Sequence, residues 1–259
     1  MTSTDALEND DLERSEAECQ RRGLGRRIPR RERRMRPIAV TETVMRLPLV
    51  PPDRVNAYLV GGVLIDSGGR FGRRRLERLL EGRELSAHVL THAHPDHQGC
   101  SRWVCQAFGI PLLCGEGDRV GAESGDQRSL MPRPGSPMIP LLNLMSGPGH
   151  PVAGTLADGD EIGGLKVIEA PGHTPGHLAF WEERTRVLIL GDVLFHMQPL
   201  TLRTVLSEPF RFATVGRAAN LASARKLAAL NPRTICFGHG PPLTDGDAFQ
   251  RFVAGLPEP

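Results

Sequence analysis

The chain has 259 residues, of which 39% are hydrophobic, so it is long enough to bury one large core or two small ones. Lysine plus arginine number 32 and aspartate plus glutamate number 30, and the formal net charge of +2 excludes a uniformly basic or acidic protein. No apolar stretch of 7 to 15 residues follows the N-terminus as in a secretory signal, and no apolar run is long enough to span a membrane. Five cysteines without a C-x-x-C pair predict neither a disulfide scaffold nor a cysteine zinc site. We therefore expect a cytoplasmic, reduced protein.

The N-terminal segment differs from the rest of the chain. Residues 1–37 carry 10 arginines and 8 acidic residues, and nine of the arginines lie in residues 21–36. This dense charge and low hydrophobicity predict an Arg-rich, disordered extension over residues 1–37, followed by one domain over residues 38–259. The arginines could contact nucleic acid, but a solvated extension is the simpler interpretation. Met35 is an alternative start, because the domain-like sequence begins immediately after it.

Segments with strand-like and helix-like patterns alternate along the remaining chain. Short apolar runs rich in β-branched residues predict strands at 55–60, 62–67, 86–91, 165–170, 177–182, 186–191 and 233–237. Helical patterns cover 71–82, 96–109, 218–230 and 247–255. This mixture is typical of an α/β fold with layers of helices on sheets.

Residues 91–99 read THAHPDHQG and gather four ligand-type side chains at the end of a predicted strand. If the strand continues through them, His92 and His94 project to the same side. Asp96 and His97 follow the turn expected at Pro95 and approach the same space from a second direction. The spacing therefore suits two neighbouring metal ions, one for each pair.

A catalytic metal generally takes three protein ligands and keeps a position open for water, so other segments must contribute. Three candidates follow predicted strands and have glycine or proline neighbours: His173 in APGHTPGH, Asp192 in LILGD and His239 in CFGHGPP. Each alone would be an ordinary loop residue. Together they place ligand-type side chains where strands open into loops, which is where α/β scaffolds present their sites.

The ordered motifs HAHPDH, PGHTPGH, LGD and GHG resemble those of the metallo-β-lactamase superfamily of metal-dependent hydrolases, including its glyoxalase II-like branch. Residues 55–68 and 156–177 resemble further parts of that family, and the similarity covers roughly residues 38–255. The resemblance implies a four-layer αββα sandwich. It also implies one metal held by His92, His94 and His173, a second held by Asp96, His97 and His239, and Asp192 as a bridge between them.

The same resemblance implies a hydrolase with two divalent ions. Histidine and carboxylate ligands suit zinc, with iron or manganese as alternatives. A hydroxide that bridges the two ions would attack the carbonyl of an ester, thioester or lactone, and Asp96 would act as the catalytic residue that orients it and moves its proton. The expected partner is a small-molecule substrate. A membrane or nucleic-acid partner is not expected, and the oligomeric state stays open.

Two other classes remain alternatives. Persulfide dioxygenases of the same fold bind one iron through the equivalents of His92, His173 and Asp192, so an oxidoreductase is the second interpretation. A binding module without catalysis ranks last, because it would not need all seven ligand positions. Within the hydrolases, glyoxalase II enzymes share a motif like GDVLF, but only 20 residues follow His239, where those enzymes have a glutathione-binding domain.

The substrate-binding region is predicted from composition. Residues 115–155 are rich in glycine and proline yet contain the apolar run MIPLLNLM, which predicts a lid or wall of the site together with residues 195–212. These segments favour a small acyl or thioester substrate. For an anionic end of that substrate, the candidate residues are Arg128, Arg133, Arg203 and Arg211. We expect His177 to make a hydrogen bond or to pack against a strand, and not to be a further ligand.

Overall fold

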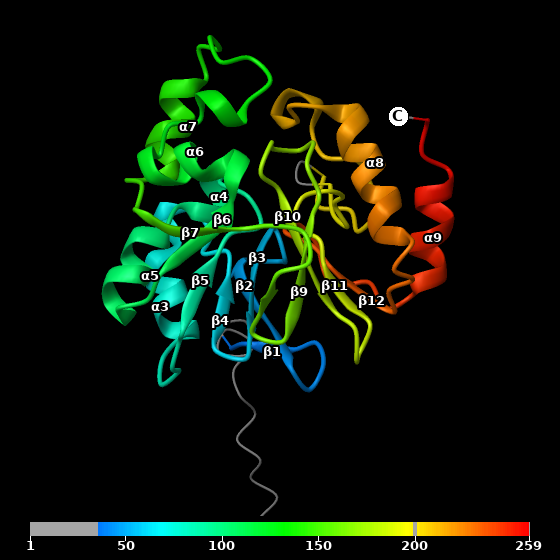
Figure 1. Ribbon diagram of the computed structural model, residues 1–259, viewed down its shortest axis with the longest axis horizontal. Coiled ribbons are helices and arrows are strands. Elements are labelled where there is room, and N and C mark those ends of the chain that lie inside the picture. Colours follow the sequence, from blue (N-terminus) through cyan, green and yellow to red (C-terminus); the bar gives the residue numbers. More distant parts are fainter. Residues whose placement is uncertain (1–35, 199–200, 259) are drawn as a thin grey trace, which may run out of the picture. The chain divides into compact units, whose positions relative to one another are not determined.

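Two β-sheets that pack face to face form the centre of the structure, and helices lie on both sides of them (Figure 1). Figure 1 shows a computed structural model, in which residues 36–198 and 201–258 are described. The predicted extension over residues 1–37 lies outside the described residues except for Arg36 and Pro37. The predicted domain of residues 38–259 is described almost completely.

The first sheet has seven strands in the order β1-β2-β3-β4-β5-β6-β7. Neighbours from β1 to β4 are antiparallel, and those from β4 to β7 are parallel. The strands are β1 (Ile38–Ala39), β2 (Val44–Val50), β3 (Val55–Val60), β4 (Val63–Ile65), β5 (Ala87–Val89), β6 (Leu112–Gly115) and β7 (Val152–Leu156).

The second sheet has five strands in the order β12-β11-β10-β9-β8. Neighbouring strands from β8 to β11 are antiparallel, whereas β11 and β12 are parallel. The strands are β8 (Glu161–Ile162), β9 (Leu165–Glu169), β10 (Leu178–Glu182), β11 (Val187–Ile189) and β12 (Thr234–Cys236).

The helices connect strands within each sheet and cover the outer faces. The α-helices are α3 (Arg73–Leu79), α4 (Pro95–Gln98), α5 (Ser101–Phe108), α6 (Arg119–Ser124), α7 (Ile139–Ser146), α8 (Arg217–Ala228) and α9 (Gly246–Ala254). Short 3-10 turns are η1 (Arg70–Gly72), η2 (Glu116–Asp118), η3 (Arg128–Leu130) and η4 (Arg211–Ala213).

The core between the sheets explains why the central strands are apolar on both sides. All six residues of β3 are buried, because one face of this strand meets the second sheet and the other meets helices. Val60 and Ile65 of the first sheet belong to the same buried cluster as Phe180 and Ile189 of the second. Burial of these side chains away from water is the main force that holds the sheets together.

The outer faces of the sheets carry separate cores. On the first sheet, Leu64 of β4 packs in one cluster with Leu76 of α3 and Val104 of α5. On the second sheet, Leu188 of β11 packs in one cluster with Leu227 of α8 and Phe249 of α9. The order of layers is therefore helix, sheet, sheet, helix, and the predicted four-layer αββα sandwich is confirmed.

One predicted helix is divided in the structure. The pattern over residues 96–109 predicted a continuous helix, but α4 ends at Gln98 and α5 begins at Ser101. Gly99 lies so close to a neighbouring turn that a Cβ atom there would sit 2.2 Å from the backbone nitrogen of Arg70. The chain leaves the helical conformation at the next residue, Cys100, with φ −107° and ψ 2°. The close approach at Gly99, which only glycine permits, is a tertiary constraint that the helical pattern does not contain.

The four described cysteines are all buried and free: Cys100, Cys105, Cys114 and Cys236. Burial raises the pKa of the Cys105 thiol to about 12, so this thiol stays protonated at neutral pH. Over residues 36–198 and 201–258, no helix has the length and apolar character needed to cross a membrane.

Candidate metal centre

The seven predicted ligand residues lie in segments that follow the carboxyl ends of strands in both sheets. Strand β5 ends at Val89, so His92 and His94 lie in the following loop and not on the strand itself. The alternation expected from a strand is therefore not what pairs them. Asp96 and His97 lie on α4, His173 lies in the turn between β9 and β10, and Asp192 and His239 follow β11 and β12.

The structure brings all seven residues together in three overlapping groups. Within each group, the potential ligand atoms lie within 4.8 Å of one another. The groups are His92, His94 and His173; His92, His97 and Asp192; and Asp96, His97 and His239. The first and third groups are the two sets of three that the family resemblance implies for separate metals.

Asp192 lies between the groups. Its Oδ2 atom is 3.1 Å from Nε2 of His239 and 3.4 Å from Nε2 of His97. The same oxygen is 3.8 Å from Nε2 of His92 and 3.8 Å from Nε2 of His173. One buried carboxylate oxygen thus faces imidazole nitrogens from both sets, which is the position that a bridging ligand requires.

The donor atoms fit a metal because they are buried and lack other partners. The Nε2 atoms of His92, His97 and His173 and Oδ1 of Asp192 are buried and have no hydrogen-bond partner among the described residues. Buried polar atoms are normally paired, so an unpaired set of ligand-type atoms within one cluster fits a metal ion. Nitrogen and carboxylate donors are the ligands that zinc, iron and manganese accept.

The second ring nitrogen of each histidine is held by another group, which fixes the ring orientation. The Nε2 atom of His94 lies 3.0 Å from the carbonyl oxygen of Leu130, which leaves Nδ1 for a ligand. Nδ1 of His173 is 3.2 Å from the Thr214 hydroxyl, and Nδ1 of His92 is 3.1 Å from Thr91 Oγ1. In His239, Nδ1 contacts the carbonyl oxygen of Arg54.

Asp66 was not singled out in the sequence, yet it organises this site. Its carboxylate lies 2.8 Å from Nδ1 of His97 and accepts hydrogen bonds from the backbone N–H and the hydroxyl of Thr91. It sits at φ 60°, in the left-handed region that aspartate tolerates better than most residues. An aspartate just past an apolar strand and before Ser67 and Gly68 was the available sequence signal.

Asp118 is a second organising residue that sequence reasoning missed. Its buried carboxylate accepts hydrogen bonds from the backbone N–H of Ala93, the hydroxyl of Thr174 and the backbone N–H of Gly176. It thereby joins the loop that carries His92 and His94 to the turn that carries His173. The two loops belong to different sheets, so this carboxylate fixes their spacing.

The charges in the cluster also favour a cation. Burial lowers the pKa of the His92 and His173 imidazoles well below the usual value, so these rings are neutral and keep a lone pair for a metal. Burial lowers the pKa of His97 and of His239, but the negative charge of Asp192 outweighs burial. The pKa of His97 is therefore well above its usual value, and that of His239 is raised to about 10. A proton and a metal ion would compete for the same ring nitrogens, so metal binding would release protons.

His177 belongs to none of the three groups. Its Nε2 atom accepts a hydrogen bond from the backbone N–H of Asp192 at 3.1 Å, and its ring stacks on His92. It therefore holds the backbone of Asp192 in place through a hydrogen bond and is not one of the grouped ligand residues.

Comparison with known proteins identifies the family. The family model described as the metallo-beta-lactamase superfamily matches residues 50–239, which is more than half of the chain. The chain belongs to this superfamily. Its fold and its histidine and aspartate groups agree with the divalent metals of such hydrolases.

Individual relatives are moderately similar. The probable metallo-hydrolase YflN of Bacillus subtilis (strain 168) is 28% identical over 216 residues, which cover 75% of this chain and 79% of YflN. The hydroxyacylglutathione hydrolase GloC of Haemophilus influenzae is 32% identical over 161 residues, covering 61% of this chain and 70% of GloC. Among solved structures, TTHA1623 in a di-iron-bound form has a TM-score of 0.59 at 27% identity and covers 76% of this chain and 92% of that protein.

Gly238 provides a test of the packing around Asp192. A Cβ atom at this position would lie 2.1 Å from Oδ1 of Asp192 and 2.7 Å from Cε1 of His97. We expect Gly238→Ala to displace the carboxylate and to weaken metal retention by about tenfold or more. The number of metal ions per chain that remain after dialysis against a chelator measures this retention. The control is Gly72→Ala, where an added Cβ would meet nothing within 4 Å; equal metal retention in both variants would contradict the packing argument.

Asp66→Asn tests the orienting carboxylate. The substitution keeps the shape but removes the negative charge next to Nδ1 of His97, so the imidazole becomes a weaker ligand. We expect metal affinity to fall by about 10- to 100-fold, measured by competition with a chromophoric chelator. Asp160→Asn, an exposed carboxylate outside the cluster, should leave the affinity unchanged. An unaltered affinity in Asp66→Asn would show that His97 does not depend on this contact.

Proposed function

We propose that this protein is a hydrolase with two divalent metal ions that cleaves an ester, thioester or lactone bond in a small molecule. His92, His94 and His173 would hold one ion, and Asp96, His97 and His239 would hold the other. Asp192 would contact both.

The observation that carries the proposal is the central position of Asp192. Its Oδ2 atom lies 3.1 Å from a histidine of the second set, His239, and 3.8 Å from histidines of the first set, His92 and His173. A site for one ion would not need ligand sets on both sides of a carboxylate. When bound, two such ions polarise the substrate carbonyl and lower the pKa of water toward neutrality.

Asp96 is the residue proposed to handle the proton. Its side chain is 38% exposed, whereas the side chain of Asp192 is 4% exposed, so it is the carboxylate of the cluster that solvent reaches. One oxygen, Oδ2, lies 3.3 Å from Nε2 of His239. The other oxygen can accept a hydrogen bond from the attacking water, orient it and pass its proton to the leaving group.

A thioester is the first substrate class to test. The relative GloC is named as a hydroxyacylglutathione hydrolase, and its 32% identity to this chain supports a thioester bond as the target. Esters and lactones follow, because hydrolysis of all three begins with attack of water on a polarised carbonyl.

Zinc is the proposed metal, with iron or manganese as alternatives, because no thiolate belongs to the three groups. The di-iron form of the similar protein TTHA1623 supports including iron in the test. A reducing, cytoplasmic location is part of the proposal and is supported by the free state of the four described cysteines.

A mononuclear iron oxidoreductase, of the persulfide dioxygenase type, is the second candidate. Nε2 of His92 and Nε2 of His173 each lie 3.8 Å from Oδ2 of Asp192, so these three residues alone surround a position for one ion. Such an enzyme would consume oxygen with a low-molecular-weight persulfide, whereas the proposed hydrolase consumes none.

The test compares hydrolysis by the metal-loaded protein with hydrolysis by variants of its ligands. Protein loaded separately with zinc, manganese or iron is assayed with simple thioesters, lactones and esters, and oxygen uptake is recorded with persulfide. We expect hydrolysis with at least one metal, and we expect Asp192→Ala and His94→Ala to lower kcat/KM by about 100-fold or more.

Asp160→Ala and His150→Ala are the matched controls, since both residues lie outside the three metal-ligand groups. Their activity should equal that of the unaltered protein. Normal hydrolysis by metal-loaded Asp192→Ala would contradict the proposal, and oxygen uptake without hydrolysis would favour the oxidoreductase.

A further inference from the structure

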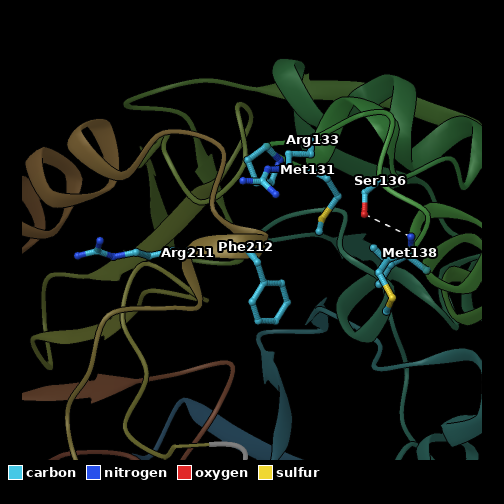
Figure 2. A pocket seen from close by; sticks show the side chains of 8 residues that line it. Met131, Arg133, Ser136, Met138, Arg211 and Phe212 are labelled. Carbon is cyan, nitrogen blue, oxygen red and sulfur yellow. Dashed lines mark hydrogen bonds between the residues drawn. The ribbon is translucent and has the colours of Figure 1, made fainter.

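A cavity of about 590 Å³ opens between two segments that lie far apart in the sequence (Figure 2). One wall comes from residues 131–142, which include the start of α7, and the other comes from Arg211 and Phe212 in η4. The size falls in the range of cavities that bind small ligands in proteins.

Both walls of this cavity are tied to the candidate metal centre. Leu130, which precedes the first wall, bonds through its carbonyl oxygen to Nε2 of His94 at 3.0 Å. Thr214, which follows the second wall, lies 3.2 Å from Nδ1 of His173 through its hydroxyl. His94 and His173 belong to the same ligand group, so the cavity is built beside that group.

The lining is apolar. Figure 2 shows the side chains of Met131, Met138 and Phe212 around the space, and Leu142 also lines it. Phe212 is 69% exposed and Met138 is 51% exposed, although both are large hydrophobic side chains. Apolar groups that face an open cavity favour an apolar ligand, and methionine adapts to ligands of different shape.

The charged residues of the lining exclude a cationic ligand. The eight lining residues include Arg133 and Arg211 but no carboxylate. In Figure 2 the side chain of Arg211 extends away from Phe212 and the methionines, but both arginines belong to the lining. A ligand here is therefore neutral or anionic.

The apolar surface continues beyond the cavity along α7. Leu141 is 47% exposed, Leu144 is 56% exposed and Met145 is 42% exposed. These residues follow Met138 at helical spacing and extend the cavity wall as an apolar stripe. A chain longer than the cavity could bury one of its sides against this stripe.

We propose that this cavity is the acyl-binding subsite of the enzyme and takes an uncharged or anionic substrate with an apolar acyl chain of several carbons. The inference rests on the proposed function, because the subsite positions a substrate for the neighbouring metal centre. Hydrolysis at the metal centre would add water across the acyl–sulfur or acyl–oxygen bond and release a carboxylic acid and a thiol or alcohol.

The first experiment measures binding without catalysis. The protein with its metals is titrated calorimetrically with butan-1-ol, hexan-1-ol and octan-1-ol, which are neutral and carry no bond to hydrolyse. Affinity should rise by up to about fourfold for each added methylene group, because each is removed from water. Phe212→Ala and Met138→Ala should weaken octan-1-ol binding by about fivefold or more.

Phe71→Ala is the matched control. Phe71 is 79% exposed, comparable to Phe212, and does not line the cavity. It should bind octan-1-ol like the unaltered protein. Absence of octan-1-ol binding to the unaltered protein, or an equal loss in all three variants, would overturn the proposal.

The second experiment separates this proposal from the proposed function. S-Acyl N-acetylcysteamine thioesters with two, four, six and eight acyl carbons are assayed with the metal-loaded protein. The ratio of kcat/KM for the octanoyl over the acetyl thioester should be high and should fall about tenfold or more in a Phe212→Ala, Met138→Ala double variant.

Each outcome has a distinct meaning. Chain-length-dependent alcohol binding without any hydrolysis supports the apolar subsite and contradicts the proposed hydrolase. Hydrolysis without chain-length dependence and without octan-1-ol binding overturns the subsite and leaves the hydrolase. A third outcome is that alcohols do not bind and that the double variant has a lower molar mass in sedimentation than the unaltered protein. The apolar face would then be an interface between two copies of the chain, which also overturns the subsite.

Discussion

The organisation of the site depends on one buried carboxylate. Asp192 is 3% exposed, and its Oδ2 atom faces Nε2 atoms of four histidines at 3.1 to 3.8 Å. A carboxylate taken out of water is costly unless an opposite charge lies next to it. The imidazoles of His97 and His239, whose pKa values Asp192 raises, supply that charge when protonated, and divalent ions would supply more of it. The position is therefore built around positive charge, whichever cation provides it.

The fold supplies this arrangement by bringing strand ends from two sheets to a common edge. Asp192 and His239 follow the parallel pair β11 and β12, while His92, His94, Asp96 and His97 follow β5 of the other sheet. Buried carboxylates then join the loops. Asp66 holds Thr91 and His97, and Asp118 links Ala93 to Thr174 and Gly176 across the two sheets. The ligand geometry rests on these contacts as much as on the strands.

The sequence predicted that these seven residues would lie together, because each follows an apolar strand and has glycine or proline nearby. It failed where the deciding contact is distant in the chain. Asp66 meets His97 after 31 residues and Asp118 meets Thr174 after 56, so neither role has a local pattern. The break between α4 and α5 has the same cause, since Gly99 is constrained by the turn at Gly69 and Arg70. Of the four arginines considered for an anionic substrate, only Arg133 and Arg211 line the cavity, while Arg128 pairs with Asp126. Side-chain direction, which composition does not contain, decides among them.

The measurement that tests this account most directly is the metal content of the protein purified without added metal. Zinc, iron and manganese are counted per chain by elemental analysis, with protein concentration from amino-acid analysis. The account predicts about two metal ions per chain, because two ligand sets flank Asp192. A content near one ion per chain, or none that survives purification or reconstitution, would contradict the two-metal centre.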